Sequence, residues 1–250
     1  MKRKILFQFM IIVLAMVLGC GGAGYKKVFK SGVKNFNNGD YKEAIKEFSI
    51  AISLNPEGKE IYFWRAKAYF KSQEYPKVFR DLTVYMEKTK KVDPQVYLLR
   101  AEAYQAVKKY KQALQDYNQG INLEANAEAY HKRGLFYIQI GAFKRAKSDL
   151  KFALKLDEEN AVIYCDLGKY YFLRKQYKQA IKDLETAVEL REGYALAHYF
   201  LGRSYLGNRD KTKALEQCQI LNKLDLRLKN KLFHFYLKLD KDSVFNKRKY

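Results

Sequence analysis

Cysteine, proline and glycine are all scarce in this chain of 250 residues. It has three cysteines, three prolines and 14 glycines, which excludes a disulfide-stapled miniprotein, a collagen-like chain and Pro- or Gly-rich low complexity. No CxxC spacing suggests a zinc site. Hydrophobic residues make up 48% and charged residues 30% of the chain, which indicates a globular protein with room for one or two domains.

Acidic residues are few relative to basic ones. The chain has 48 Lys and Arg against 27 Asp and Glu, a formal net charge of +21. Such an excess bears on solubility and on anionic partners, and it says little about fold. We expect no nucleic-acid partner, because the N-terminus carries the export signal described next.

Long apolar runs are absent after the first twenty residues, which read MKRKILFQFMIIVLAMVLGC. Three basic residues are followed by an apolar run over residues 5–18, which is shorter than the roughly 20 residues that a membrane-spanning helix needs. A basic start before a short apolar core is typical of a secretory signal peptide. We therefore predict a signal peptide over residues 1–19.

The run closes on Val17-Leu18-Gly19-Cys20, which resembles the lipobox of bacterial lipoproteins. The resemblance implies that the Cys20 thiol receives diacylglycerol (the palmitate class of modification) and becomes the first mature residue. The protein would then be anchored to a membrane of the bacterial cell envelope, on its periplasmic or outer face. A plain signal peptide or an uncleaved anchor, with Cys20 incidental, is the alternative. The glycine-rich segment over residues 20–24 is expected to form a flexible tether behind the lipid.

Aromatic and small residues recur in a fixed order about every 34 residues. Thirteen of the 21 tyrosines occupy the fourth, eleventh and seventeenth positions of this repeat. Small residues hold the eighth position, where they allow close helix packing. The clearest copies read Tyr62-Ala66-Tyr69-Tyr75-Val78, Tyr97-Ala101-Tyr104-Tyr110-Ala113, Tyr130-Gly134-Tyr137-Phe143-Ala146 and Tyr164-Gly168-Tyr171-Tyr177-Ala180. Six repeats are predicted, over residues 25–58, 59–93, 94–126, 127–160, 161–194 and 195–228.

The pattern resembles the tetratricopeptide repeat (TPR), with its best copy in Gly32, Gly39-Asp40-Tyr41-Lys42-Glu43-Ala44 and Pro56. The resemblance implies an all-α, right-handed superhelical solenoid of about six helix hairpins. After residue 228, an apolar stripe predicts a capping helix over residues 229–240, and a basic tail follows over 241–250. One extra residue before Pro94 predicts a looser junction near residues 88–94.

Catalytic motifs are missing. The sequence has no phosphate-binding glycine loop, no His-Glu-x-x-His and no Gly-x-Ser-x-Gly. We expect His198 to pack in the core and Cys165 and Cys218 to be buried thiols. The chain is therefore interpreted as a non-enzyme, with neither a metal nor a cofactor.

In the resembled family, the exposed positions of the first helices line a concave groove that holds a partner protein. Apolar patches with this placement usually mark partner sites. The alternative is that the same stripe only packs between adjacent first helices. The lysine and asparagine clamp of chaperone-binding family members is not expected, since Phe29 and Val33 stand where it would begin. The candidate groove residues are Phe29, Val33, Phe36, Phe63, Lys67, Phe70, Leu98, Leu135, Ile138, Lys169, Phe172, Tyr199, Arg203 and Leu206.

The leading hypothesis is a non-enzymatic, membrane-anchored scaffold or adaptor whose groove binds a segment of an unknown partner protein. Similar architectures occur in outer-membrane barrel assembly, pilus secretin piloting and peptidoglycan-enzyme scaffolding, and the resemblance does not choose among them. The alternative is a structural lipoprotein whose basic surface binds anionic lipid or cell-wall polymer. Lysines cluster at the predicted helix turns, where a solvated basic face is the plain explanation and salt-dependent binding to an anionic membrane or wall polymer is the functional one. They are Lys108, Lys109, Lys111, Lys144, Lys147, Lys175 and Lys178.

Overall fold

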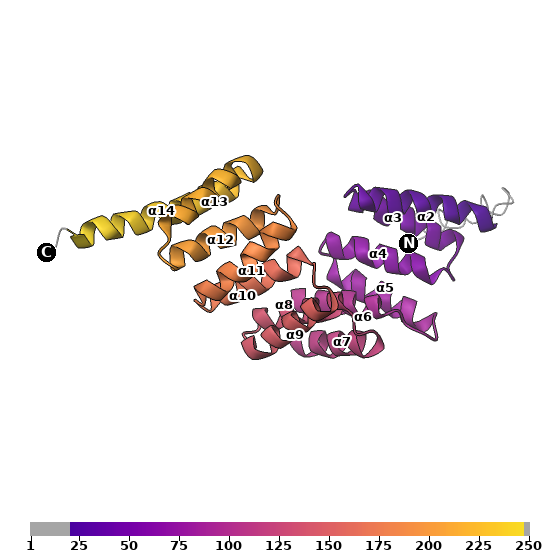
Figure 1. The fold of residues 1–250 in the computed structure, drawn as a ribbon. Helices are drawn as coiled ribbons and strands as arrows, with labels where there is room; N and C mark the ends of the chain where they lie inside the picture. Colours follow the sequence, from indigo (N-terminus) through magenta and orange to yellow (C-terminus); the bar gives the residue numbers. More distant parts are fainter. Residues whose placement is uncertain (1–20, 248–250) are drawn as a thin grey trace. The chain divides into compact units, whose positions relative to one another are not determined.

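The computed structural model describes the backbone of residues 21–247 and the side chains of residues 24–238. All regular secondary structure in this part of the chain is helical, in thirteen helices (Figure 1). The signal peptide predicted over 1–19 and Cys20 lie outside the described residues. The helices are α2 (Gly21–Asn37), α3 (Tyr41–Leu54), α4 (Lys59–Lys71), α5 (Tyr75–Glu87), α6 (Pro94–Ala106), α7 (Tyr110–Leu123), α8 (Ala127–Gln139), α9 (Phe143–Leu156), α10 (Ala161–Leu173), α11 (Tyr177–Leu190), α12 (Ala195–Gly207), α13 (Lys211–Leu224) and α14 (Leu226–Lys247).

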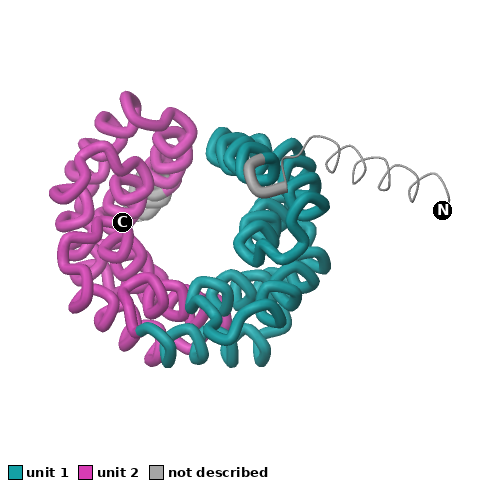
Figure 2. The backbone as a smooth tube through the Cα atoms, turned by 90° about the vertical axis from the view of Figure 1, so that its right-hand side faces the viewer, with its two compact units in different colours: residues 1–124 teal, residues 125–250 magenta. Residues whose placement is uncertain are grey.

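The helices form six hairpins, which confirms the all-α hairpin fold that the family resemblance implies. The chain divides into two compact units, coloured separately in Figure 2. Unit 1 (residues 1–124) holds the hairpins α2–α3, α4–α5 and α6–α7. Unit 2 (residues 125–250) holds α8–α9, α10–α11, α12–α13 and the last helix, α14. No described helix combines the length and the apolar character that crossing a membrane requires.

Two predicted boundaries differ from the structure. Residues 21–24 belong to the start of α2, where the sequence suggested a flexible tether. The last helix begins at Leu226 and continues to Lys247, so it takes in most of the segment predicted as a basic tail. The loop before α6 spans residues 88–93 and is the longest connection between described helices. This loop accommodates the extra residue of the second repeat.

The two helices of a hairpin approach closely at the eighth repeat position. A Cβ added at Gly168 would lie 2.5 Å from Cγ of Leu184, and one at Gly134 would lie 3.0 Å from Cγ of Leu150. Each leucine stands sixteen residues after its glycine, on the second helix, and is fully buried. Because these distances leave no room for a larger side chain, the small residue fixes how the two helices face each other.

Every first helix ends in the same left-handed turn. The residue at the fifteenth repeat position has a positive φ in all six hairpins, although only two of the six are glycines. The next amide donates to the carbonyl oxygen five residues earlier, for example from Gln176 to Tyr171 at 2.9 Å. This is the Schellman arrangement. The six turn residues are Gly39, Gln73, Lys108, Gly141, Lys175 and Arg209.

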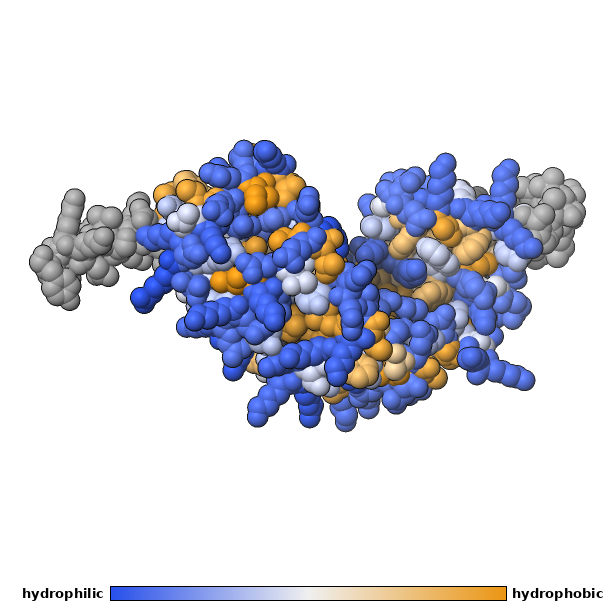
Figure 3. All heavy atoms as spheres, viewed as in Figure 1, coloured by the Kyte–Doolittle hydropathy of each residue, from blue (hydrophilic) through white to orange (hydrophobic). Residues whose placement is uncertain are grey.

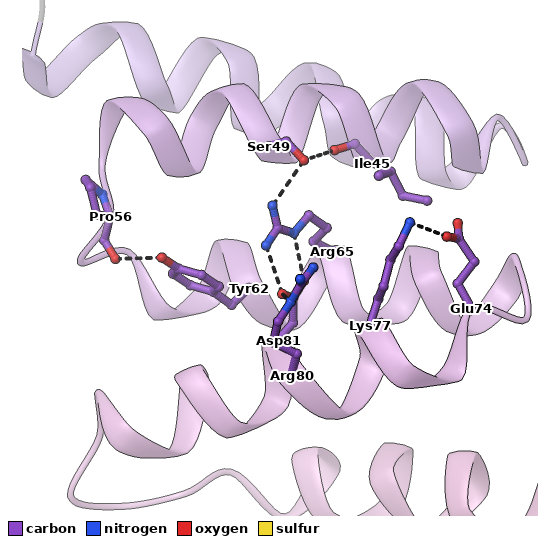
Figure 4. Close-up of polar contacts among 9 residues, drawn as sticks. All are labelled: Ile45, Ser49, Pro56, Tyr62, Arg65, Glu74, Lys77, Arg80 and Asp81. Carbon is purple, nitrogen blue, oxygen red and sulfur yellow. Dashed lines mark hydrogen bonds and ion pairs between the residues drawn. The ribbon is translucent and has the colours of Figure 1, made fainter. Parts of the chain in front are cut away.

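A buried arginine–aspartate pair ties the two helices together in three hairpins. Nε and Nη2 of Arg65 donate to the two carboxylate oxygens of Asp81, at 2.7 and 2.8 Å, and Nη1 donates to Oγ of Ser49 on α3 (Figure 4). Two further pairs repeat this bidentate geometry sixteen residues apart: Arg100–Asp116 and Arg133–Asp149. Paired guanidinium and carboxylate groups satisfy each other where water is excluded.

The fifth hairpin lacks this arginine. Leu167 occupies its place, while Asp183 stays buried at 7% exposure. Oδ2 of Asp183 has no hydrogen-bond partner, and Oδ1 receives only a 3.5 Å contact from the Gln179 side chain. Burial raises the pKa of Asp183 to about 6.

The last helix, α14, completes the core of the sixth hairpin. Leu232 is fully buried, and its Cδ2 lies 2.4 Å from where a Cβ on Gly202 would be. In the fourth and fifth hairpins this place is filled by a leucine of the second helix, but the sixth hairpin has the smaller Cys218 there. Leu232 fills the space that Cys218 leaves.

Replacing Asp183 by asparagine should stabilise the protein at neutral pH. Because the pKa of Asp183 is raised when folded, the folded state holds a proton more tightly between about pH 4 and 6, and wild-type stability falls as pH rises through that window. Above pH 6 the asparagine variant should gain about 1–3 kcal/mol, because it removes the charge that burial makes costly, at about 1.4 kcal/mol for each pKa unit by which Asp183 is raised. Urea unfolding followed by circular dichroism from pH 4 to 8 measures the difference.

Asp116→Asn is the matched control, since it leaves Arg100 without its carboxylate and should destabilise the protein at pH 7. A loss of stability of similar size in both variants would contradict the assignment of Asp183 as an unpaired charge.

Candidate functional site

The predicted groove residues of unit 1 lie on the first helices α2, α4 and α6. Six are half-buried, which leaves part of each side chain accessible: Phe29, Val33, Phe36, Phe63, Lys67 and Phe70. Leu98 on α6 differs, because it is 1% exposed. Its Cδ2 packs 2.8 Å from where a Cβ on Gly120 would be, so it belongs to the hairpin core and not to a groove.

Lys67 is the centre of an aromatic cluster in unit 1. Its ammonium lies 4.1 Å from the ring centroid of Trp64, and 5.5 and 5.7 Å from those of Phe63 and Phe36. Trp64 meets Phe36 edge-on, with ring centroids 5.4 Å apart. Such contacts contribute about 0.5–1 kcal/mol each at exposed sites. We call these four residues the Lys67 cluster.

Phe63 and Phe70 also pack against the second helix of their own hairpin. The rings of Phe63 and Tyr85 are 5.8 Å apart, as are those of Phe70 and Tyr75. The sequence left two alternatives for these side chains: they line a groove, or they only pack between helices. In unit 1 the same side chains are packed on one side and half-exposed on the other.

A second cation–aromatic cluster lies in unit 2, around Arg203 of α12. Its guanidinium lies 3.7 Å from the ring centroid of Phe235, 5.0 Å from that of Phe172 and 5.8 Å from that of Tyr199. Nη1 of Arg203 also donates to the Tyr199 hydroxyl at 3.0 Å. We call these four residues the Arg203 cluster. Phe235 comes from α14, so the last helix contributes to this surface as well as covering the sixth hairpin.

The other predicted residues of unit 2 divide between surface and core. Lys169 lies 5.7 Å from the ring centroid of Phe200, and Leu135 and Ile138 on α8 are half-buried. Leu206 is 6% exposed, on a helix that α10, α13 and α14 all contact. It is therefore a core residue, and its prediction as a groove residue was wrong.

The sequence alone missed Trp64, Phe235 and a polar contact between neighbouring first helices. Nε2 of His131 on α8 lies 2.8 Å from a carboxylate oxygen of Asp166 on α10. The chain's single tryptophan, next to Phe63 on a first helix, was the available signal for Trp64. Phe235 carried no such signal, because it lies outside the repeats.

The thiols and His198 have structural surroundings. Both described cysteines are unpaired and buried, and burial raises the pKa of the Cys165 thiol to about 12. A thiol with so high a pKa is a poor nucleophile at neutral pH. His198 is buried and donates from Nε2 to the carbonyl oxygen of Glu192 at 2.7 Å. Within the described residues, no group of His, Cys, Asp or Glu side chains has the geometry of a metal site.

The two clusters can offer a partner rigid aromatic area and a positive charge at one place. Tryptophan, tyrosine and arginine dominate binding energy at protein interfaces, because large planar side chains bury much area at small entropic cost. A cation held over rings is already oriented, which lowers the cost of binding a carboxylate or an apolar anchor.

Comparison with known families finds tetratricopeptide repeats in four stretches of the chain. A family model described as TPR repeat matches residues 35–73. Models described as tetratricopeptide repeat match residues 94–126, 127–160 and 165–222.

Known proteins are similar over their repeat regions. Serine/threonine-protein phosphatase 5 of Rattus norvegicus is 32% identical over 114 residues, which are 44% of this chain and 23% of that protein. The chain spans about a quarter or less of the curated relatives it matches.

Among solved structures, the hetero-tetramer Cut9–Hcn1 of the APC/C matches with a TM-score of 0.72 and 15% identity, over 92% of this chain and 46% of that chain. PilW, a type IV pilus biogenesis factor, matches with a TM-score of 0.71 and 13% identity, over 81% and 94%. At these identities the likeness shows the fold alone. The family matches and the six hairpins show that this chain contains tetratricopeptide repeats.

Proposed function

We propose that this protein is a non-enzymatic, membrane-anchored adaptor that binds a partner protein segment on its first helices. The observation that carries the proposal is the pair of half-exposed cation–aromatic clusters centred on Lys67 and Arg203. A partner with apolar or aromatic anchors and an acidic residue beside them would complement each cluster.

The cell-envelope role is an assembly role of the barrel-assembly, secretin-piloting or peptidoglycan-enzyme scaffolding type. The fold likeness to PilW supports the pilus alternative at the level of architecture. The anchor is Cys20, at the end of the lipobox-like segment. A lipid there, next to a strongly basic chain, supplies the two membrane signals that stable attachment needs.

The groove is tested by photo-crosslinking in envelopes. Phe63 and Phe172, replaced one at a time by the photoreactive p-benzoylphenylalanine, keep an aromatic ring at each cluster. The same replacement at Phe152 is the control, because that ring is 41% exposed on the second helix α9. We expect a discrete crosslinked product from Phe63 or Phe172 and none from Phe152.

Removing the charge of Lys67 tests whether the Phe63 crosslink depends on the Lys67 cluster. Lys67→Met keeps the methylene stem but removes the ammonium, and should weaken the Phe63 product several-fold while the chain stays folded. Lys42→Met, at an exposed position of α3, should leave it unchanged. Identical crosslinks from all three sites would refute the groove.

The anchor is tested by Cys20→Ala. The variant should incorporate no tagged fatty acid and should keep its signal peptide, because the other two cysteines are buried within the repeats. Its helical circular dichroism should match that of the wild type, and its location alone should change. Equal labelling of both proteins, or labelling of neither, would show that the chain is not a lipoprotein.

A second candidate function is direct binding of anionic lipid or wall polymer by the basic surface. Hydrophilic side chains cover most of the face shown in Figure 3 and surround separate apolar areas. Lysines at the hairpin turns are exposed, among them Lys109, Lys111, Lys144 and Lys178. Such lysines contribute about 1 kcal/mol each near an anionic surface at low salt.

Vesicle sedimentation tests the second candidate with the full-length Cys20→Ala chain. It should pellet with phosphatidylglycerol vesicles and not with phosphatidylcholine vesicles, and moderate salt should release it, because exposed charges are screened. Failure to pellet with phosphatidylglycerol at low salt would remove this candidate.

A further inference from the structure

A lysine-lined recess of about 530 Å³ lies beside the turn between α10 and α11, within unit 2. Three helices and the turn supply its walls, and no aspartate or glutamate lines it. We call it the lysine recess. Its principal residues are Lys147 of α9, Tyr171 of α10, Lys175 of the turn, Tyr177 and Lys178 of α11, and Asn208 after α12.

The recess exists because one residue departs from the repeat pattern. Lys147 stands at the twenty-first repeat position, which is apolar in every other hairpin. In unit 1 the residue there is Phe79, which stacks on Tyr104 with ring centroids 4.5 Å apart. Lys147 instead places its ammonium 5.5 Å from the ring centroid of Tyr171, the counterpart of Tyr104. An apolar contact between neighbouring hairpins is thus replaced by a cation, which helix stacking does not require.

Positive charge in the recess is not compensated by the described part of the protein. Lys147, Lys175 and Lys178 make no ion pair with any described residue. Three ammonium groups around one recess repel one another, and an anion between them converts that repulsion into attraction.

The backbone adds to this field. Helix α11 starts at the recess, and its N-cap residue Gln176 makes no side-chain hydrogen bond to the first turn. The amides of that turn therefore lack a side-chain cap, and the helix N-terminus carries a partial positive charge.

We propose that the lysine recess binds a phosphate group. Lysine ammonium groups bind phosphate as point charges, and the N-terminus of α11 beside them presents backbone amides to the same anion. The phosphate belongs either to the head group of an anionic lipid or to a soluble phosphate compound. The assignment to a lipid head group depends on the second candidate function, and it places the lipid binding of that function at one recess. The recess shares no residue with either cation–aromatic cluster, so it does not depend on the partner groove.

The test is calorimetric titration of the full-length chain in detergent. Inorganic phosphate is one probe, and glycerophosphoglycerol, the head group of phosphatidylglycerol, is the other. Tighter binding of glycerophosphoglycerol supports the lipid source, and tighter binding of inorganic phosphate supports the soluble source. Pentaglutamate serves as a carboxylate probe.

The decisive variant is Lys147→Leu, which restores the residue type that Leu114 provides at the same repeat position. It should keep or raise stability against urea and weaken phosphate binding at least about tenfold, the loss of one charge-assisted contact. Because the fold is retained, weak binding cannot be attributed to unfolding.

Lys175→Gly and Lys108→Gly form a matched pair. Both lysines occupy the left-handed turn position, with φ of 57° and 60°, where two other hairpins have glycine. The substitutions remove the same charge, but only Lys175 lines the recess. We expect several-fold weaker phosphate binding for Lys175→Gly and less than about twofold change for Lys108→Gly.

Equal phosphate binding by all variants, no binding by the wild type, or tighter binding of pentaglutamate than of either phosphate probe would overturn the proposal. The two lipid hypotheses fail separately. If the chain still sediments with phosphatidylglycerol vesicles while the recess binds no phosphate, the second candidate function is supported and the recess is not its site. If the chain binds phosphate but does not sediment with phosphatidylglycerol vesicles, the recess is a site for a soluble phosphate compound.

Discussion

The close approach of the two helices within each hairpin is the constraint on which the rest of the described structure depends. A small residue at the eighth repeat position packs against the side chain sixteen residues later, as Gly168 packs against Leu184. The same sixteen-residue relation, one position earlier, places Arg100 opposite Asp116. With that register fixed, one side of each first helix is turned away from its own hairpin, and the cation–aromatic clusters form there.

The hairpins were predictable through the resemblance to the tetratricopeptide repeat. The 34-residue period carries that resemblance, because helix packing imposes the same small and aromatic residues in each copy. The period could not predict which exposed-looking positions are buried. Leu98 and Leu206 follow the groove spacing, yet both are core residues because a neighbouring helix covers them. The clusters were only half predictable, since Trp64 and Phe235 lie outside the groove positions and join through folding. The cysteine that would anchor the chain lies outside the described residues and stays a prediction.

Two departures from the repeat pattern meet at the fifth hairpin. Leu167 removes the arginine that would neutralise Asp183, and Lys147 removes an apolar contact with the fourth hairpin. The first change removes an ion pair that three other hairpins keep, and the second removes an apolar residue that all five other hairpins keep. Burial of an unpaired carboxylate and exposure of clustered ammonium groups both cost free energy in the isolated protein. A repeat array tolerates such costs because its neighbours supply stability additively.

A stack of similar hairpins has no inherent end. The second helix of the last hairpin exposes the same surface that, in every earlier hairpin, packs against the next one. In this protein the last helix, α14, covers that surface. Cys218 is too short to fill the space beside Gly202, and Leu232 of α14 occupies it completely. Helix α14 therefore covers the sixth hairpin, with Leu232 in the space that the short side chain of Cys218 leaves. Because α14 contacts both α12 and α13, it occupies the position beside the sixth hairpin that the first helix of a following repeat would take.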